Sequence, residues 1–135
     1  LVKVLPYHPF LVKPNNHELG DIFGVKLSTR EEVVPYGKKL QEMGAQNVLI
    51  SMAGEGAVLI AADGQGMEAP APKGTLVNGV GAGDSMVAGF LTGWMEKKDY
   101  VHAFHMGIAA GSASAFSENL ATREEIMQVL QQVEQ

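Results

Sequence analysis

A glycine-rich stretch at residues 78–85, Asn-Gly-Val-Gly-Ala-Gly-Asp-Ser, carries residue types suited to phosphate chemistry. Its alternating glycines end at Asp84, and an apolar run at residues 86–91 follows at once. This pattern predicts a loop that opens into a buried helix. Glycine lets backbone N–H groups turn toward one point, and the first turn of a helix leaves its N–H donors unpaired. We therefore predict an anion site, most naturally for phosphate, with Asp84 beside it as a base for an attacking hydroxyl.

A structural explanation fits the same stretch, because a glycine-rich turn followed by an Asp or Ser cap is a common start for a core helix. Two known phosphate motifs do not fit. A Walker loop requires Gly-Lys-Ser/Thr, and no lysine follows here. A dinucleotide fingerprint places its third glycine three residues after the second, whereas Gly79, Gly81 and Gly83 alternate. Phosphoryl transfer is thus favoured over nicotinamide chemistry, and the capped helix stays open as an alternative.

Asn15 and Glu18 form a second candidate pair, placed just after a predicted strand. Residues 10–13 are a short apolar run that predicts a buried strand, and Pro14 is expected to end its pairing. Residues 15–23 then predict a helix with Asn15 and Glu18 on one face of its first turn. Amide and carboxylate oxygens suit a hydrated Mg²⁺ ion. The alternative is that the same two residues only cap the helix.

The third candidate is a turn between two predicted strands, at residues 47–52 and 57–61. Ser51 ends the first strand, and Gly54 and Gly56 lie in the turn. Glycines in this position can approach a ligand closely. Taken alone, the pattern indicates only a hairpin turn.

Capping signals and periodicity predict the other elements. Ser28 and Glu31 have capping-box spacing and predict a helix to about Met43, in which Pro35 indicates a kinked first turn or a later start. The remaining predictions are short strands at residues 66–71 and 74–77, and helices from the glycine-rich stretch to about Lys97, from Tyr100 to about Phe116 with Asp99 as its cap, and from Thr122 onward.

Small residues mark the two central predicted helices. Gly89 and Gly93 are one turn apart and predict close packing against a neighbouring helix. Residues 107–114 are mostly Gly, Ala and Ser, which also lets a helix or a flat ring approach the backbone. His102 and His105 have no third ligand type nearby, so we predict no metal site there.

The composition excludes several functions. The 135 residues, 46% apolar and 19% charged, suffice for one domain, which we expect to span residues 1–135. The net charge is −5 with scattered basic residues, so no nucleic-acid partner is expected. The absence of cysteine excludes disulfides and thiol catalysis. No apolar run is long enough to span a bilayer, and we expect no membrane partner and a cytoplasmic location.

The element order predicts an α/β domain with a partly parallel sheet. Ligands in such sheets bind at the carboxyl ends of the strands. The turns after residues 10–13 and 47–52 follow predicted strands, and the glycine-rich stretch is expected to follow another. All three candidates are therefore expected at one edge of the sheet.

The three stretches resemble, in the same order, motifs of the PfkB sugar kinases, which have the ribokinase-like fold. Residues 80–90 are similar to the family signature, residues 13–19 to its Asn-x-x-Glu motif and residues 51–57 to its nucleotide-binding turn. Residues 110–122 are most similar to the branch that phosphorylates fructose 1-phosphate, with the tagatose-6-phosphate branch as a near neighbour. The resemblance covers the whole chain.

This resemblance implies a three-layer αβα fold, ATP and Mg²⁺ as cofactors, and a sugar phosphate as substrate. The implied roles are Asp84 as catalytic base; Gly81, Ala82 and Gly83 as anion hole; Asn15 and Glu18 as organisers of Mg²⁺ and phosphate; Ser51, Gly54, Gly56 and Gly83 as nucleotide contacts; and Gly111 and Ser114 beside the adenine.

The chain departs from the family pattern at two positions and in its extent. Gly79 stands where Thr or Ser is frequent, and the first glycine of Ala53-Gly54 usually comes one residue earlier. The chain resembles only the C-terminal portion of such a kinase, so we expect the sugar-binding half and its lid to precede Leu1. This chain alone is then expected to lack activity, and a homodimer is a candidate state of the full-length protein. A nucleotide-binding or structural piece without turnover is the alternative.

Overall fold

The computed structural model describes residues 2–52, 56–70, 82–116 and 130, with the backbone alone at residues 2, 82–84 and 112–116. The chain divides into two compact units, Leu1–Pro70 and Ala71–Gln135. In the described residues, the first unit is a sheet with helices and the second is a pair of helices. The single domain expected over residues 1–135 stays a prediction.

The first unit is organised around a four-stranded sheet in the order β1-β2-β3-β4. A 3₁₀ helix, η1 (Val2–Tyr7), precedes the strands, which are β1 (Leu11–Val12), β2 (Asn47–Ser51), β3 (Ala57–Ile60) and β4 (Gly66–Ala69). β1 is parallel to β2, and the two hairpins β2-β3 and β3-β4 are antiparallel. The prediction of a partly parallel α/β sheet is confirmed for this unit.

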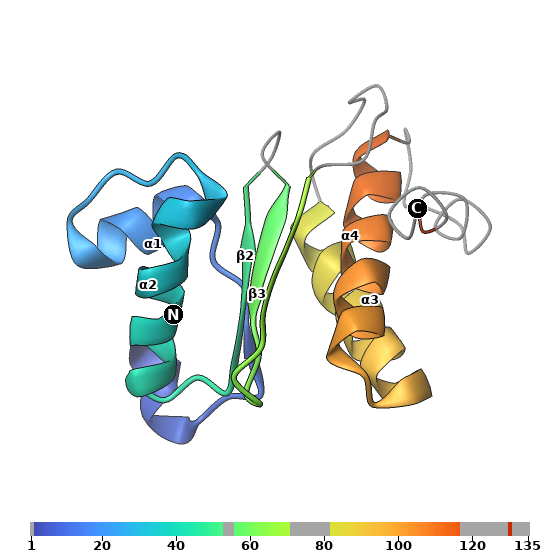
Figure 1. Cartoon of the computed structure of the whole chain (residues 1–135), viewed down its shortest axis with the longest axis horizontal. Coiled ribbons are helices and arrows are strands. Elements are labelled where there is room, and N and C mark those ends of the chain that lie inside the picture. The colour runs from blue at the N-terminus through green and yellow to red at the C-terminus, as the bar shows by residue number, and fades with distance from the viewer. Residues whose placement is uncertain (1, 53–55, 71–81, 117–129, 131–135) are drawn as a thin grey trace. The chain divides into compact units, whose positions relative to one another are not determined.

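Helices α1 (Asn16–Phe23) and α2 (Arg30–Glu42) lie on one side of this sheet (Figure 1). They form the parallel crossover between β1 and β2. Gly37 lets α2 approach closely, because a Cβ there would lie 2.9 Å from Cγ1 of Ile60. The core between the helices and the sheet is built mainly from Leu19, Val33, Leu40, Val48, Ile50, Val58 and Ile60.

Asn47 is a fully buried polar residue at the start of β2. Its Nδ2 donates to the carbonyl of Phe10 at 2.8 Å, and its Oδ1 accepts from the backbone N–H of Ala62 at 2.7 Å. Because both ends of the amide are satisfied, its burial is tolerated. Asn47 therefore links the segment before β1 to the residues that follow β3.

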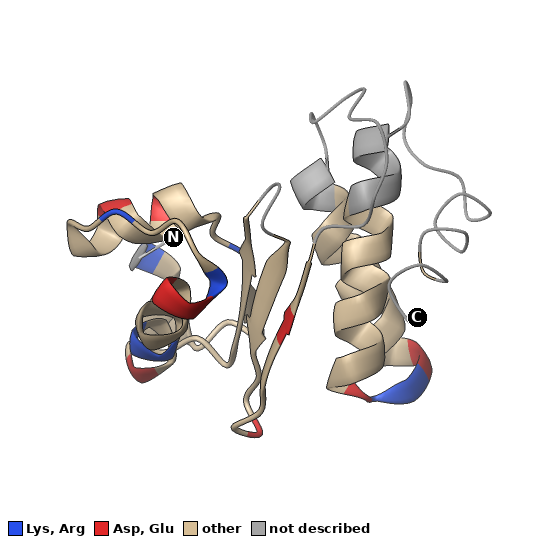
Figure 2. Cartoon of the chain, turned by 45° about the horizontal axis from the view of Figure 1, so that its top comes forward, with Lys and Arg blue, Asp and Glu red and all other residues tan. Residues whose placement is uncertain are grey.

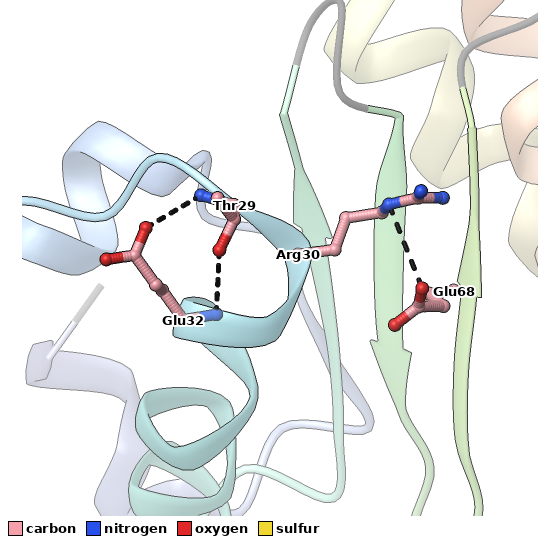
Figure 3. A network of polar contacts seen from close by, with 4 residues as sticks. All are labelled: Thr29, Arg30, Glu32 and Glu68. Carbon is pink, nitrogen blue, oxygen red and sulfur yellow. Dashed lines mark hydrogen bonds and ion pairs between the residues drawn. The ribbon is translucent and has the colours of Figure 1, made fainter.

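α2 begins one residue later than the sequence predicted. Thr29, not Ser28, is the N-cap, and its hydroxyl accepts from the backbone N–H of Glu32 at 3.2 Å (Figure 3). Oε1 of Glu32 accepts from Thr29 N–H at 3.0 Å and from Ser28 N–H at 3.1 Å. The capping box is therefore Thr29–Glu32 rather than Ser28–Glu31. Pro35 lies inside the helix and does not delay its start.

An ion pair joins the start of α2 to β4. Nε of Arg30 lies 3.9 Å from Oε1 of Glu68. Figure 3 shows this pair as a dashed line between the two side chains. The Glu68 side chain is about half exposed, at 52%. A long and exposed pair of this kind contributes little to stability, at most about 1 kcal/mol.

The second unit contains helices α3 (Ala82–Lys97) and α4 (Tyr100–Phe116), which pack against each other as consecutive helices (Figure 1). Asp99 caps α4 as predicted, since its Oδ1 accepts from Val101 N–H at 2.9 Å. A Cβ at Gly89 would lie 2.6 Å from Cβ of Ala110 and from the carbonyl O of Met106. The prediction of close packing at the helix glycines is therefore confirmed.

Charged residues of the first unit are carried mainly by helices and turns rather than by the strands (Figure 2). Within the described parts of the chain, no helix is both long and apolar enough to cross a membrane. The strand predicted at residues 74–77 lies outside the described residues. The helix predicted from Thr122 does too, apart from the helical and buried Leu130.

Candidate functional site

Asn15 and Glu18 lie at the start of α1 and form a complete capping box. Oδ1 of Asn15 accepts from Glu18 N–H at 2.7 Å, and Oε1 of Glu18 accepts from Asn15 N–H at 3.0 Å. The structural alternative proposed from the sequence is thus realised. It does not exhaust the oxygens, because an ionised carboxylate offers about four lone-pair sites and this box uses one of them.

The backbone brings the Asn15 loop directly against the end of β2. Asn15 and Ser51 form an isolated parallel β-bridge, and Ser51 N–H donates to the carbonyl of Pro14 at 3.1 Å. The β1–β2 ladder ends at Val12, before Pro14, as predicted. Pairing resumes beyond Pro14 only as this isolated bridge, because proline lacks an N–H but keeps its carbonyl acceptor. Two of the three candidate loops therefore meet at the carboxyl ends of β1 and β2, where α/β proteins bind ligands.

The turn after β2 is described at Ser51, Met52 and Gly56. Met52 N–H donates to the carbonyl of Gly56 at 2.9 Å, which closes the turn between β2 and β3. Gly56 has φ +97°, and a Cβ there would overlap the carbonyl O of Ala69. Gly56 is thus required by the hairpin itself. Gly54 lies outside the described residues.

The glycine-rich stretch is described from Ala82 onward, and the helix begins earlier than its loop pattern predicted. Ala82, Gly83 and Asp84 form the first turn of α3 instead of a loop before it. Ala favours helix, and glycine is tolerated in a first turn where the backbone donors have no helical partner. These donors, with the positive end of the helix dipole, suit an anion. Gly81 lies outside the described residues.

Gly111 and Ser114 are both in α4. Gly111 is buried, and Ser114 is described by its backbone alone. On the preceding turn, a Cβ at Gly107 would lie 3.0 Å from the carbonyl O of Met86 in α3. Helix packing therefore accounts for the small residue at that position. A place for the adenine beside Gly111 and Ser114 stays a prediction.

The described residues place the sequence-derived candidates in two groups. Asn15, Glu18, Ser51 and Gly56 belong to the first unit, whereas Ala82, Gly83, Asp84, Gly111 and Ser114 belong to the second. Within the first unit, the Asn15 loop and the end of β2 at Ser51 are in contact through the backbone.

The oxygen donors of Asn15 and Glu18 fit a Mg²⁺ ion. Among the described residues, no three His, Cys, Asp or Glu side chains gather as a metal-binding group. Mg²⁺ does not need such a cage, because it is usually held by one or two carboxylates together with phosphates and waters. The exposed Glu18 carboxylate beside the Asn15 amide meets this requirement.

One residue at this edge was missed by the sequence analysis. Nδ2 of Asn16 donates to the carbonyl of Leu27 at 2.7 Å and so joins the first turn of α1 to the connector before α2. The sequence carries no signal for this bond beyond the polarity of Asn16, because the partner is a backbone group eleven residues away.

Two solved structures have folds similar to the fold of this chain. A crystal structure of a Staphylococcus aureus protein superposes with a TM-score of 0.91 and 40% identity over 97% of this chain and 42% of its own. Phosphofructokinase-2 from Escherichia coli in complex with substrates and products superposes with a TM-score of 0.88 over 99% of this chain and 44% of its own. At 24% identity, the latter similarity indicates the fold alone.

Curated proteins are also similar to this chain in sequence. The 1-phosphofructokinase of Bacillus subtilis is 52% identical over 98% of this chain and 44% of its own length. A D-tagatose-1-phosphate kinase of Bacillus licheniformis is 36% identical over 99% of this chain. The chain thus spans less than half the length of these relatives. The pattern of the pfkB carbohydrate kinases matches residues 1–127. On this match the chain belongs to the pfkB family of carbohydrate kinases.

Proposed function

We propose that this chain is part of an ATP-dependent kinase that phosphorylates a ketose 1-phosphate, most simply fructose 1-phosphate, to give fructose 1,6-bisphosphate. The observation that carries the proposal is the contact between the Asn15 loop and the end of β2 at Ser51. It joins the predicted metal and phosphate residues to the predicted nucleotide turn, in a chain of the pfkB family.

The names of the relatives support this substrate class. They are 1-phosphofructokinases and D-tagatose-1-phosphate kinases, which share a ketohexose 1-phosphate. Fructose and tagatose differ only in the configuration at C4, so tagatose 1-phosphate is the second candidate substrate. The sequence-based alternative, tagatose 6-phosphate, carries its phosphate at the other end of the sugar.

In the proposed reaction, Asp84 accepts the proton of the attacking sugar hydroxyl. The γ-phosphoryl group of ATP passes to that oxygen, and ADP leaves. Negative charge spreads over the phosphoryl oxygens during transfer. Backbone N–H groups from Gly81 to Gly83 would donate to these oxygens. For Ala82 and Gly83, this role agrees with their place in the first turn of α3. Mg²⁺ held at Asn15 and Glu18 would neutralise phosphate charge.

Substrate binding is expected to need more of the protein than this chain. The chain spans 44% of the Bacillus subtilis relative. We propose that the chain alone is inactive, and that Ser51, Gly54, Gly56, Gly83, Gly111 and Ser114 serve the nucleotide. Tests of activity therefore use the full-length kinase, which is this chain extended to the length of its relatives. A cytoplasmic homodimer is proposed for it.

A coupled assay of ADP release by the full-length kinase tests this function. It compares fructose 1-phosphate, tagatose 1-phosphate, tagatose 6-phosphate and fructose 6-phosphate at equal concentrations. We expect the highest kcat/KM with fructose 1-phosphate and little turnover with either 6-phosphate. Absence of turnover with all four sugars, despite ATP binding, would favour the non-catalytic alternative.

A further inference from the structure

We infer that Asn16 is a positioning residue, which orients the Asn15–Glu18 pair by tying the first turn of α1 to the connector that follows the helix. This inference rests on the proposed role of Asn15 and Glu18 in holding Mg²⁺ and phosphate. It concerns a residue for which the family motif Asn-x-x-Glu specifies no type.

The connector after α1 runs back along one face of the helix. Gly24 ends α1 in the left-handed conformation, with φ +69°. Val25 N–H donates to the carbonyl of Gly20 at 2.9 Å. A Cβ at Gly20 would overlap the carbonyl O of Val25, so the connector touches the helix at this point. Two residues later, Leu27 accepts the bond from Asn16, one turn closer to the start of the helix.

Asn16 and Gly20 are four residues apart and therefore lie on the same face of α1. The connector is thus attached to that face at two successive turns. The Leu27 side chain is buried in the core of the first unit, at 6% exposure. The backbone carbonyl of Leu27 is therefore held in place. The hydrogen bond from Asn16 to this carbonyl restricts the movement of the first turn of α1.

Asn15 is in this way held on both sides. On the sheet side, it is bridged to Ser51, whose N–H donates to the preceding carbonyl of Pro14 at 3.1 Å. On the helix side, the next residue is bonded to Leu27 at 2.7 Å. The capping box alone would only hold Asn15 and Glu18 to each other. The hydrogen bond from Asn16 adds, on the helix side, a second attachment of the pair to the core.

The test measures the Kd for Mn²⁺, as a paramagnetic stand-in for Mg²⁺, by EPR of the full-length kinase with saturating ADP. Asn16→Ala removes the donor and is expected to raise this Kd about 2- to 10-fold, the range of one net hydrogen bond. Asn16→Gln keeps a carboxamide donor and should recover part of the affinity. If Asn16→Ala does not fold, the inference is tested by the Kd of Asn16→Gln for Mn²⁺, compared with the Kd values of the wild type and the two controls.

Two controls separate positioning from general destabilisation. Gly64→Ala strains a left-handed glycine, with φ +91°, in the turn between β3 and β4 without crowding, because nothing lies within 4 Å of an added Cβ. Gln46→Ala removes the same type of bond, from Nε2 to the carbonyl of His8 at 2.9 Å, beside the amino end of β2. Both variants are expected to keep the wild-type Kd for Mn²⁺.

The inference is overturned by an unchanged Kd in Asn16→Ala, by an equal rise in Gly64→Ala, or by a wild-type kinase that binds no Mn²⁺ with ADP. The proposed function fails separately. A wild-type kinase that binds Mn²⁺ and ADP and responds to Asn16→Ala, but turns over none of the sugar phosphates, would refute the reaction and retain the role of Asn16.

Discussion

Glu18 in α1 and Glu32 in α2 occupy the same position, the third residue of the helix, and each accepts a 3.0 Å hydrogen bond from the backbone N–H of its N-cap residue. The capping box of Glu18 lies at the carboxyl ends of β1 and β2, and the capping box of Glu32 lies at the start of α2. The chain therefore contains a matched pair of glutamates, of which only Glu18 is proposed to serve the metal.

Glu18→Gln should raise the Mg²⁺ concentration needed for half-maximal activity, because it removes the charge while glutamine still supports a capping box. Outer ligands and supports of metal sites typically change affinity by about 10- to 100-fold when replaced. Glu32→Gln is the control and should leave the Mg²⁺ requirement unchanged. Equal Mg²⁺ curves for Glu18→Gln and the wild type would remove Glu18 from the metal site.

The cap at Glu32 makes part of the stability pH-dependent. The backbone N–H of Ser28, and next that of Thr29, lower the pKa of Glu32 by donating to its carboxylate. Because the pKa is lower in the folded state, the stabilisation is present above the unfolded-state value, about 4.3, and is lost as the pH falls through the folded-state value. Glu32→Gln should therefore cost stability at neutral pH and progressively less below pH of about 4.

Urea unfolding of wild type and Glu32→Gln between neutral and acidic pH measures this difference. Glu31→Gln removes a neighbouring charge from the first turn of α2 without removing the cap, and should show a smaller change. A difference between wild type and Glu32→Gln that stays constant with pH would contradict the assignment of the cap.

Asp84→Asn in the full-length kinase should lower kcat by about 10²- to 10⁴-fold, the usual contribution of a general base. ATP binding should be nearly unchanged, because the backbone donors of the first turn of α3 are retained. Asp99→Asn is the matched control at the start of α4, where an asparagine can still cap the helix. Steady-state kinetics and ATP titration measure both effects, and an unchanged kcat would exclude Asp84 as the base.

Gly89→Val should destabilise the α3–α4 pair by about 1–3 kcal/mol, since an added side chain meets Ala110 and Met106 at 2.6 Å. Gly66→Val in β4 is the control, because an added Cβ there has no neighbour within 4 Å and valine favours strands. The midpoint of urea unfolding should fall for Gly89→Val and not for Gly66→Val. A midpoint at the wild-type value for Gly89→Val would mean that the two helices separate without cost.

Local signals allowed α1 to be predicted almost to the residue. The sequence predicted a helix over residues 15–23, and the helix spans Asn16–Phe23 with Gly24 as its left-handed C-cap. Both ends depend on neighbours within four residues, which a sequence displays directly. The start of α2 was less certain because Ser28 and Thr29 are both good caps, and Glu31 and Glu32 both suit the third helical position.

The candidate site could be predicted only in part, because its contacts are not local. The carboxyl-end rule placed Asn15 and Ser51 at one edge, but not the backbone bridge between them, which uses the carbonyl of Pro14. The bond from Asn16 to Leu27 was also invisible, since it depends on the path of the connector. The start of α3 at Ala82 came earlier because glycine-rich sequence does not by itself distinguish a loop from a first helical turn.

The short link between α3 and α4 has a consequence for the order of folding. Only Lys98 and Asp99 separate the two helices, and Lys98 makes the turn with φ +51°. Their mutual contacts therefore join segments that are close in sequence, whereas the bridge from Asn15 to Ser51 closes a loop of 36 residues. Contacts at short sequence separation form quickly, and closure of longer loops is slower. In pulse-labelling hydrogen exchange, amides of α3 and α4 should gain protection before the N–H of Ser51.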